Sequence, residues 1–266
     1  MYGRTRCRKI PRRFRHVIEV INPFPPTDRA MREPNGLLAL GGDLTPAMLL
    51  SAYAQGIFPW FSDNEEILWW TPCPRLVLQT RDIHISRSMR KLLRQSDWTL
   101  RYDRAFNKVI RYCATITRDA DGTWITREMQ SAYQTLHEMG VAHSVEVYEA
   151  GQLIGGLYGV LLGKMFFGES MFSLESNASK VACIALSKTC AQGGIHLIDC
   201  QVENPHLSSL GATLMARKDF ENHLHGAIKI SMEDILSNPL RLVPERRQSL
   251  PERLGSRALR SMGELL

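Results

Sequence analysis

A carboxylate and a carboxamide stand two residues apart near the end of a short apolar segment, residues 195–202. This segment follows two glycines and is rich in branched side chains, so it predicts a buried β-strand. Side chains alternate along a strand, and Asp199 and Gln201 would therefore point to one face. A buried carboxylate needs hydrogen bonds or a polar cleft, which makes the pair a candidate for proton chemistry or for orienting a substrate amine. The alternative is a structural Asp199 that holds a neighbouring loop.

A second acid, Glu169, lies in another apolar segment, residues 165–171. Two acids on strands of one sheet could share a cleft, where one would bind a cation and the other would handle a proton. The alternative is a salt-bridged glutamate at the end of a strand.

Aromatic and basic side chains gather at two places that suit a nucleic acid. Residues 58–70 contain three tryptophans and two phenylalanines, which could form a wall for a flat base or simply a compact aromatic core. Arg87, Arg90, Lys91 and Arg94 follow helical spacing and would form one basic face. That face is either a contact for phosphates or an ordinary solvated surface.

The bulk composition indicates a globular protein of 266 residues with a net charge of +6. Residues 1–16 account for much of this charge, because they contain seven basic residues and no acid. No apolar stretch is long enough to span a bilayer, and no secretory signal is recognisable. The six cysteines show no CxxC spacing, which favours reduced thiols in the cytoplasm over disulfides or a zinc site.

The element pattern predicts an α+β protein. We expect a basic disordered arm at residues 1–16, a small N-terminal domain at 17–75, a larger domain at 76–239 and a polar tail at 240–266. Helices are expected at residues 45–55, 86–95, 126–139, 178–192 and 205–210, and strands at 144–148, 153–161, 165–171 and 195–202.

Nine segments, in this order along residues 22–222, resemble the leucyl/phenylalanyl-tRNA–protein transferase family, and together they are far more specific than any one of them. They are EPNGLLALGGDLTP (Glu33–Pro46), GIFPWFS (Gly56–Ser62), ILWWTPCPR (Ile67–Arg75), HISRSMRK (His84–Lys91), GTWIT (Gly122–Thr126), YGVLLGKMFFGESMFS (Tyr158–Ser173), NASK (Asn177–Lys180), LIDCQV (Leu197–Val202) and HLSSLGA (His206–Ala212).

The resemblance implies a small N-terminal domain and a larger domain with a GNAT-like acyltransferase fold and a mostly antiparallel mixed sheet. It implies transfer of Leu or Phe, with Met as a further candidate, from aminoacyl-tRNA to an acceptor protein that begins with Arg or Lys. The product would enter N-degron proteolysis. Neither a metal nor another cofactor is expected, and we expect a monomer.

Residue by residue, the resemblance assigns Asp199 and Gln201 to the acceptor α-amine and Glu169 to the acceptor's basic first residue. Trp60 and Trp124 resemble the aromatics that hold the 3′-terminal adenosine. The basic helix gives the tRNA-backbone candidates Arg87, Lys91 and Arg94. The aminoacyl side chain would enter an apolar pocket of Leu157, Phe166, Leu186 and Ile198, in which the leucines at 157 and 186 depart from the Met and the aromatic residue that we associate with the family.

Two other functions remain open at this stage. A GNAT-type N-acetyltransferase would share the fold, but residues 172–177 contain no glycine to cradle a pyrophosphate before the next helix. A non-catalytic RNA-binding module would explain the tryptophans and the basic helix, and it would leave Asp199, Gln201 and Glu169 without a role.

Overall fold

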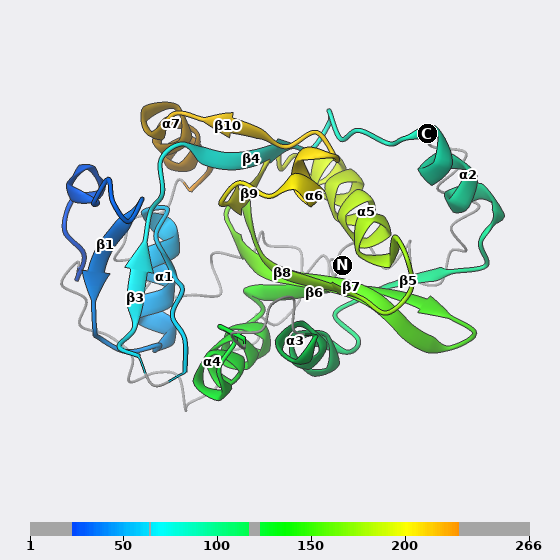
Figure 1. Ribbon diagram of the computed structural model, residues 1–266, viewed down its shortest axis with the longest axis horizontal. Coiled ribbons are helices and arrows are strands. Elements are labelled where there is room, and N and C mark those ends of the chain that lie inside the picture. The colour runs from blue at the N-terminus through cyan, green and yellow to red at the C-terminus, as the bar shows by residue number, and fades with distance from the viewer. Residues whose placement is uncertain (1–22, 64, 117–122, 229–266) are drawn as a thin grey trace, which may run out of the picture.

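The computed structural model describes residues 23–63, 65–116 and 123–228, which form two β-sheets with helices packed around them (Figure 1). The smaller sheet has three antiparallel strands in the order β1-β3-β2. The larger sheet has seven strands in the order β10-β4-β9-β8-β7-β6-β5. The expected arm at residues 1–16 and tail at 240–266 lie outside the described residues.

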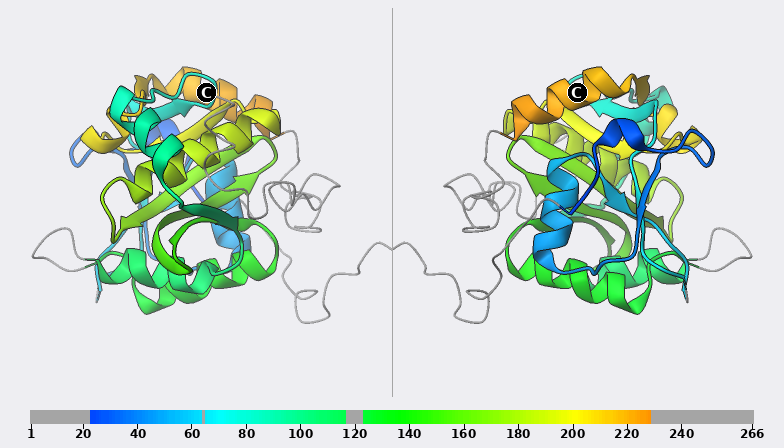
Figure 2. Two further views of the ribbon diagram at one scale, coloured as in Figure 1. Left: turned by 90° about the vertical axis from the view of Figure 1, so that its right-hand side faces the viewer. Right: turned by 90° about the vertical axis from the view of Figure 1, so that its left-hand side faces the viewer.

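The N-terminal part contains a short 3₁₀ helix (Thr27–Arg29), β1 (Leu37–Leu40), α1 (Pro46–Ala54), β2 (Phe58–Pro59) and β3 (Leu68–Trp70). Helix α1 begins as its sequence predicts, because the Thr45 hydroxyl accepts a hydrogen bond from the Met48 amide and Pro46 occupies the first helical position. In the right-hand view of Figure 2, α1 stands beside the small sheet, with α7 above it and α4 below.

The large sheet is antiparallel except at one pair, β8 and β9, which run parallel. A helix, α5, makes the crossover between these two strands. The mostly antiparallel, mixed α+β architecture that the sequence predicts is therefore confirmed. The strands are β4 (Arg75–Gln79), β5 (Thr99–Tyr102), β6 (Ala142–Glu149), β7 (Gln152–Leu162), β8 (Met165–Ser173), β9 (Leu197–Gln201) and β10 (Thr213–Met215).

The helices cover both faces of the large sheet. Two of them, α3 and α4, pack with α1 on one face, and α5 packs on the other (Figure 1). The face under α3 and α4 continues into the core of the N-terminal part, so one apolar cluster joins the two sheets. The helices are α2 (Arg87–Gln95), α3 (Phe106–Thr115), α4 (Arg127–Glu138), α5 (Ala178–Gln192), α6 (Pro205–Ser208) and α7 (Arg217–Ala227).

The strands β8 and β9 pair over a short distance only, and a site can form where they separate. Pairing is limited to residues 165–167 of β8 and 197–199 of β9, after which no further register pairs join the two strands. Glu169 and Gln201 both follow the last pair, so their side chains lie where the sheet opens.

Most of the expected elements are confirmed, and α5 spans the expected residues 178–192. The sequence pattern did not predict the short 3₁₀ helix, the three strands of the small sheet (β1, β2 and β3), or β4, β5, α3, β10 and α7. The change of sheet between Trp70 and Arg75 is compatible with the expected domain boundary at residue 75, although the boundary itself stays a prediction. Within the described ranges, no helix is long and apolar enough to cross a membrane.

Candidate active site

A cavity of about 190 Å³ opens where β8 and β9 separate. Its walls come from β2, β4, β7, β8, α5, β9 and the segment around α6, with Trp124 from the segment before α4. Among the described lining residues, Glu169 is the one acidic side chain, and most of the others are apolar or aromatic. The cavity therefore combines one anionic position with a largely apolar wall.

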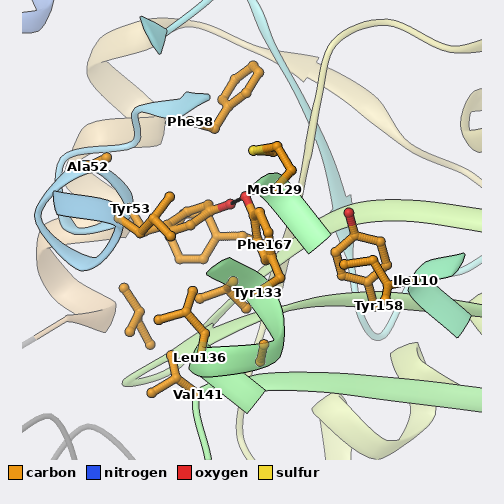
Figure 3. Packing of buried hydrophobic residues seen from close by; sticks show 14 of the residues in the cluster. Ala52, Tyr53, Phe58, Ile110, Met129, Tyr133, Leu136, Val141, Tyr158 and Phe167 are labelled. Carbon is orange, nitrogen blue, oxygen red and sulfur yellow. Dashed lines mark hydrogen bonds between the residues drawn. The ribbon is translucent and has the colours of Figure 1, made fainter. Parts of the chain in front are cut away.

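Glu169 is 8% exposed and is held by three side-chain donors. Its Oε1 accepts hydrogen bonds from the Tyr53 hydroxyl (2.6 Å) and from Gln201 Nε2 (2.8 Å). Its Oε2 accepts a hydrogen bond from the Tyr133 hydroxyl (2.9 Å). The two tyrosine hydroxyls also lie within hydrogen-bonding reach of each other, as the dashed line in Figure 3 shows. Each hydroxyl carries one proton, so a bond between them forms only when one of them does not donate to Glu169. Tyr53 comes from α1 and Tyr133 from α4, so distant segments fix this carboxylate.

The protonation of Glu169 is poised near neutrality. Burial raises the pKa of Glu169 to about 7, the nearby charge of Asp199 adds to this rise, and the bonds from Tyr53, Tyr133 and Gln201 oppose it. Burial, reinforced by the negative charge of Glu169, also raises the pKa of Tyr53 and of Tyr133 well above the ordinary value. Both phenols therefore stay neutral and keep their protons for donation.

Asp199 lies behind Gln201 and is not among the described residues that line the cavity. It is 0% exposed, and both of its oxygens accept hydrogen bonds from the guanidinium of Arg75, at 2.8 Å from Nε and 2.7 Å from Nη2. Its Oδ1 also accepts the backbone N–H of Gln201 at 2.9 Å. The carboxylate thus joins a buried cation to the backbone of the residue that faces the cavity.

Arg75 is the principal site residue that the sequence analysis missed. It is 1% exposed, and its guanidinium contacts the rings of Phe58 (4.9 Å) and Phe220 (4.7 Å). Such cation–π contacts and a bidentate carboxylate help to offset the cost of burying the charge. In the sequence, Arg75 stands at the edge of the apolar segment that forms β4, which could have drawn attention to it. The sequence did not identify its partner, however.

Gln201 departs from strand geometry at the end of β9. Its φ is +65°, a left-handed conformation that is uncommon for a residue with a side chain and that concentrates at functional sites. The bond from its N–H to Asp199 Oδ1 supports this conformation. Its Nε2 is used on Glu169, so its side-chain oxygen remains as the acceptor that a ligand can meet.

The two predicted adenosine-binding tryptophans both line the cavity. Trp60 is 42% exposed, which is unusual for so large an aromatic side chain, and Trp124 is half-buried. The backbone oxygen of Trp60 accepts a hydrogen bond from Trp70 Nε1 at 2.7 Å, and the two rings lie 5.8 Å apart. This contact holds the Trp60 segment, and Trp60 itself stays partly exposed to solvent.

Three of the four predicted apolar pocket residues, Leu157, Leu186 and Ile198, line the cavity. Phe166 is placed behind them, in the same apolar cluster, and is not among the described lining residues. Its ring packs over Gly159, where a Cβ atom would lie 2.5 Å from it. Met171 and Cys183, which the sequence pattern did not mark as pocket residues, also line the cavity.

Cys200 is half-buried in the cavity wall. Burial and the negative charge of Asp199 raise the pKa of its thiol well above the ordinary value. A thiol in this state is a poor nucleophile.

The basic helix is separate from the cavity. Arg87, Lys91 and Arg94 are exposed on α2, and Ser86 caps the helix through a hydrogen bond from the Met89 amide. Figure 1 shows α2 on the opposite side of the molecule from α1. These side chains face solvent, and their contact with tRNA stays a prediction.

Comparison with known proteins identifies the family. The model of the leucyl/phenylalanyl-tRNA protein transferase family matches residues 77–225, and the model of that family's N-terminal domain matches residues 42–73. Among solved structures, a GCN5-related N-acetyltransferase from Kribbella flavida superimposes with a TM-score of 0.34 and 12% identity, over 64% of this chain and 61% of that one. This overlap is too slight to bear on the fold or the function.

Two curated relatives are much more similar. The leucyl/phenylalanyl-tRNA–protein transferase of Xanthomonas axonopodis pv. citri (strain 306) is 56% identical over 199 residues, which are 74% of this chain and 80% of that protein. The protein of the same name from Nitrosospira multiformis is 54% identical over 201 residues, 76% of this chain and 87% of that protein. The match therefore spans both parts of the molecule, and the chain belongs to the leucyl/phenylalanyl-tRNA–protein transferase family.

Proposed function

We propose that this protein transfers Leu or Phe from aminoacyl-tRNA to the α-amine of an acceptor protein that begins with Arg or Lys. The observation that carries the proposal is a cavity in which one buried carboxylate, Glu169, faces an apolar wall and two tryptophans. Such a cavity suits a cationic first residue on the acceptor and an apolar aminoacyl group on the donor. Met is a further candidate donor, and the modified protein would enter N-degron proteolysis.

The residues that line the cavity indicate where the aminoacyl-tRNA donor binds. The 3′-terminal adenosine stacks on Trp60 and Trp124, because aromatic rings bind bases through their faces. The aminoacyl side chain packs against Leu157, Leu186 and Ile198, and Phe166 supports this wall from behind. The exposed face of α2 contacts phosphates of the acceptor stem through Arg87, Lys91 and Arg94.

At the acceptor end, Glu169 binds the basic first residue, and Gln201 positions the α-amine. Gln201 donates from Nε2 to Glu169, so its Oε1 is oriented to accept a hydrogen bond from the amine. Asp199 acts as an orienting group rather than a base, because Arg75 engages both of its oxygens and it does not line the cavity.

The reaction needs no strong base and no covalent nucleophile. An α-amine has a pKa of roughly 8, so a useful fraction is neutral at physiological pH. The amine attacks the ester carbonyl, a C–N bond forms, the C–O bond to the ribose breaks, and the amine's surplus proton leaves with the ribose oxygen. The protein contributes mainly by holding the two substrates in attack geometry.

The test is transfer of labelled Leu from Leu-tRNA to peptides that begin with Arg, Lys or Ala. We expect transfer to Arg and Lys but not to Ala, and a large loss for Glu169→Gln because the anionic position is removed. Absence of transfer to all three peptides, with tRNA binding intact, would instead favour a non-catalytic RNA-binding module.

We further propose that the protein works as a monomer in the cytoplasm. Its described cysteines, Cys73, Cys113, Cys183, Cys190 and Cys200, are free thiols, which is compatible with a reducing compartment. Sedimentation of the purified protein tests the monomer, and fractionation of cells tests the compartment.

A further inference from the structure

Tyr158 on β7 lines the cavity, and no described residue uses its hydroxyl. Tyr158 is 0% exposed, and its ring packs edge-on against Phe106 (5.8 Å) and Tyr133 (5.6 Å). Its hydroxyl has no hydrogen-bond partner among the described residues. Buried hydroxyls are normally hydrogen-bonded, and a phenylalanine would fill the same space without the unpaired group.

The position of Tyr158 points to a ligand as the missing partner. Tyr158 lines the cavity together with Glu169, and it pairs across the sheet with Ser170, the neighbour of Glu169 on β8. Figure 3 shows Tyr158 in the same apolar cluster as Tyr53 and Tyr133, whose hydroxyls meet near the centre of the view. Those two hydroxyls bond to Glu169, whereas the Tyr158 hydroxyl has no partner within the described residues.

The hydrogen-bond capacity of Glu169 indicates which kind of group this is. A carboxylate offers about four acceptor sites, and three protein donors already occupy Glu169, so about one remains. A lysine ammonium brings three N–H donors and an arginine guanidinium brings five. Glu169 alone therefore cannot satisfy a basic side chain, and another acceptor is needed beside it.

We propose that the Tyr158 hydroxyl accepts a hydrogen bond from the cationic side chain of the acceptor's first residue, next to Glu169. The inference rests on the proposed function, since it concerns the acceptor subsite of the same cavity. Tyr158 is then a specificity-determining residue, because a neutral apolar first residue would leave its hydroxyl buried and unpaired. Burial and the charge of Glu169 raise the pKa of Tyr158 well above its ordinary value, so it stays a neutral phenol.

The test is Tyr158→Phe, which removes the oxygen and leaves the ring in place. Hydrogen bonds to charged groups are among the stronger ones, so we expect KM for Arg- and Lys-initiated peptides to rise about 10- to 100-fold. The KM for aminoacyl-tRNA and the kcat are expected to stay near the wild-type values. The Tm is expected to be unchanged or higher, because the variant loses no hydrogen bond within the described protein.

The matched control is Tyr102→Phe. Its hydroxyl bonds to Thr189 at 3.2 Å, and Tyr102 does not line the cavity, so we expect unchanged acceptor KM. An unchanged acceptor KM in Tyr158→Phe, with wild-type transfer intact, would overturn the inference alone. A fall in kcat without a change in KM would also overturn it, because the hydroxyl would then act on the reacting amine. Absence of transfer by the wild type would instead refute the proposed function.

Discussion

The paired charges of Arg75 and Asp199 allow a direct test of whether Asp199 orients Gln201 or acts as a base. The two side chains are 1% and 0% exposed and share two hydrogen bonds of 2.7 and 2.8 Å. Asp199→Asn removes the negative charge and leaves the Arg75 cation buried without compensation. Loss of one partner of a buried pair costs about 3–5 kcal/mol. For a protein of this size, such a loss lowers Tm by about 10 °C.

A compensating substitution separates stability from catalysis. In the double variant Arg75→Met with Asp199→Asn, no charge remains in the pair. The methionine can pack against Phe58 and Phe220, whose rings the guanidinium contacts in the wild type. The new amide oxygen at 199 can still accept the Gln201 N–H. We therefore expect most of the lost stability to return, and transfer to recover to within about tenfold of the wild type, because the loss of a base would cost far more.

The assay combines urea unfolding with single-turnover transfer of labelled Leu to an Arg-initiated peptide. Arg75→Lys is the matched control, because it keeps the charge and loses the bidentate geometry. The reasoning would be refuted if the double variant regained stability while its transfer rate stayed about 100-fold or more below that of the wild type. That outcome would assign Asp199 a role in proton transfer, since removal of a general base has effects of this size.

Three further predictions concern Glu169, the basic helix α2 and the apolar wall of the cavity. Binding of an Arg-initiated peptide should strengthen as pH rises from 6 to 8 and then level off, as measured by calorimetry without tRNA. The reason is that Glu169, with a pKa of about 7, must ionise to bind the cation. Glu169→Gln should abolish this pH dependence. Charge reversal of Arg87 and Lys91 should flatten the salt dependence of tRNA binding, measured by filter binding, and an unchanged slope would exclude the phosphate contact. Leu186→Ala should raise the ratio of Phe to Leu transfer in competition assays, because it enlarges the apolar wall.

A rise in pH, which is expected to strengthen peptide binding at Glu169, is expected to lower the stability of the folded protein. The pKa of Glu169 is about 7 in the folded protein and 4.5 for an ordinary glutamate. The folded state therefore holds a proton that the unfolded chain has lost, and stability falls as pH rises from about 4.5 to 7. Chemical unfolding across this range, compared with Glu169→Gln, measures the effect, and equal slopes for both proteins would contradict it.

Local chemistry explains which elements were predictable. Thr45, Ser86 and Thr126 each accept the hydrogen bond that caps a helix, and each stands directly before its helix in the sequence. Helix α3 has no such cap at Ala105. Instead, Glu146 on β6 accepts the amides of Arg104 and Ala105 at 3.0 and 2.8 Å. A start signal supplied from a distant strand cannot be read from the local sequence.

Prediction of the site residues is limited in the same way, because some of them depend on contacts between distant segments. Asp199, Gln201 and Glu169 were identifiable because polar side chains stand out in apolar strands. Their partners were not, because Tyr53 and Tyr133 have the character of ordinary core aromatics until their hydroxyls are seen on Glu169. Arg75 is 124 positions from Asp199, and only the pairing of β4 with β9 brings the two together. The local sequence pattern does not show which distant strands pair, so it could not predict this contact.

Because the two tyrosines that hold Glu169 lie in different parts of the chain, the two parts are expected to evolve together. Tyr53 belongs to the N-terminal part, and Tyr133 and Glu169 belong to the part built on the large sheet. A recombination event between relatives with a crossover near Trp70 would therefore exchange one of the two phenols that hold Glu169 along with the small sheet. Such a hybrid keeps its carboxylate in place only if both parents supply a phenol at the matching positions, so these positions are expected to vary jointly or not at all.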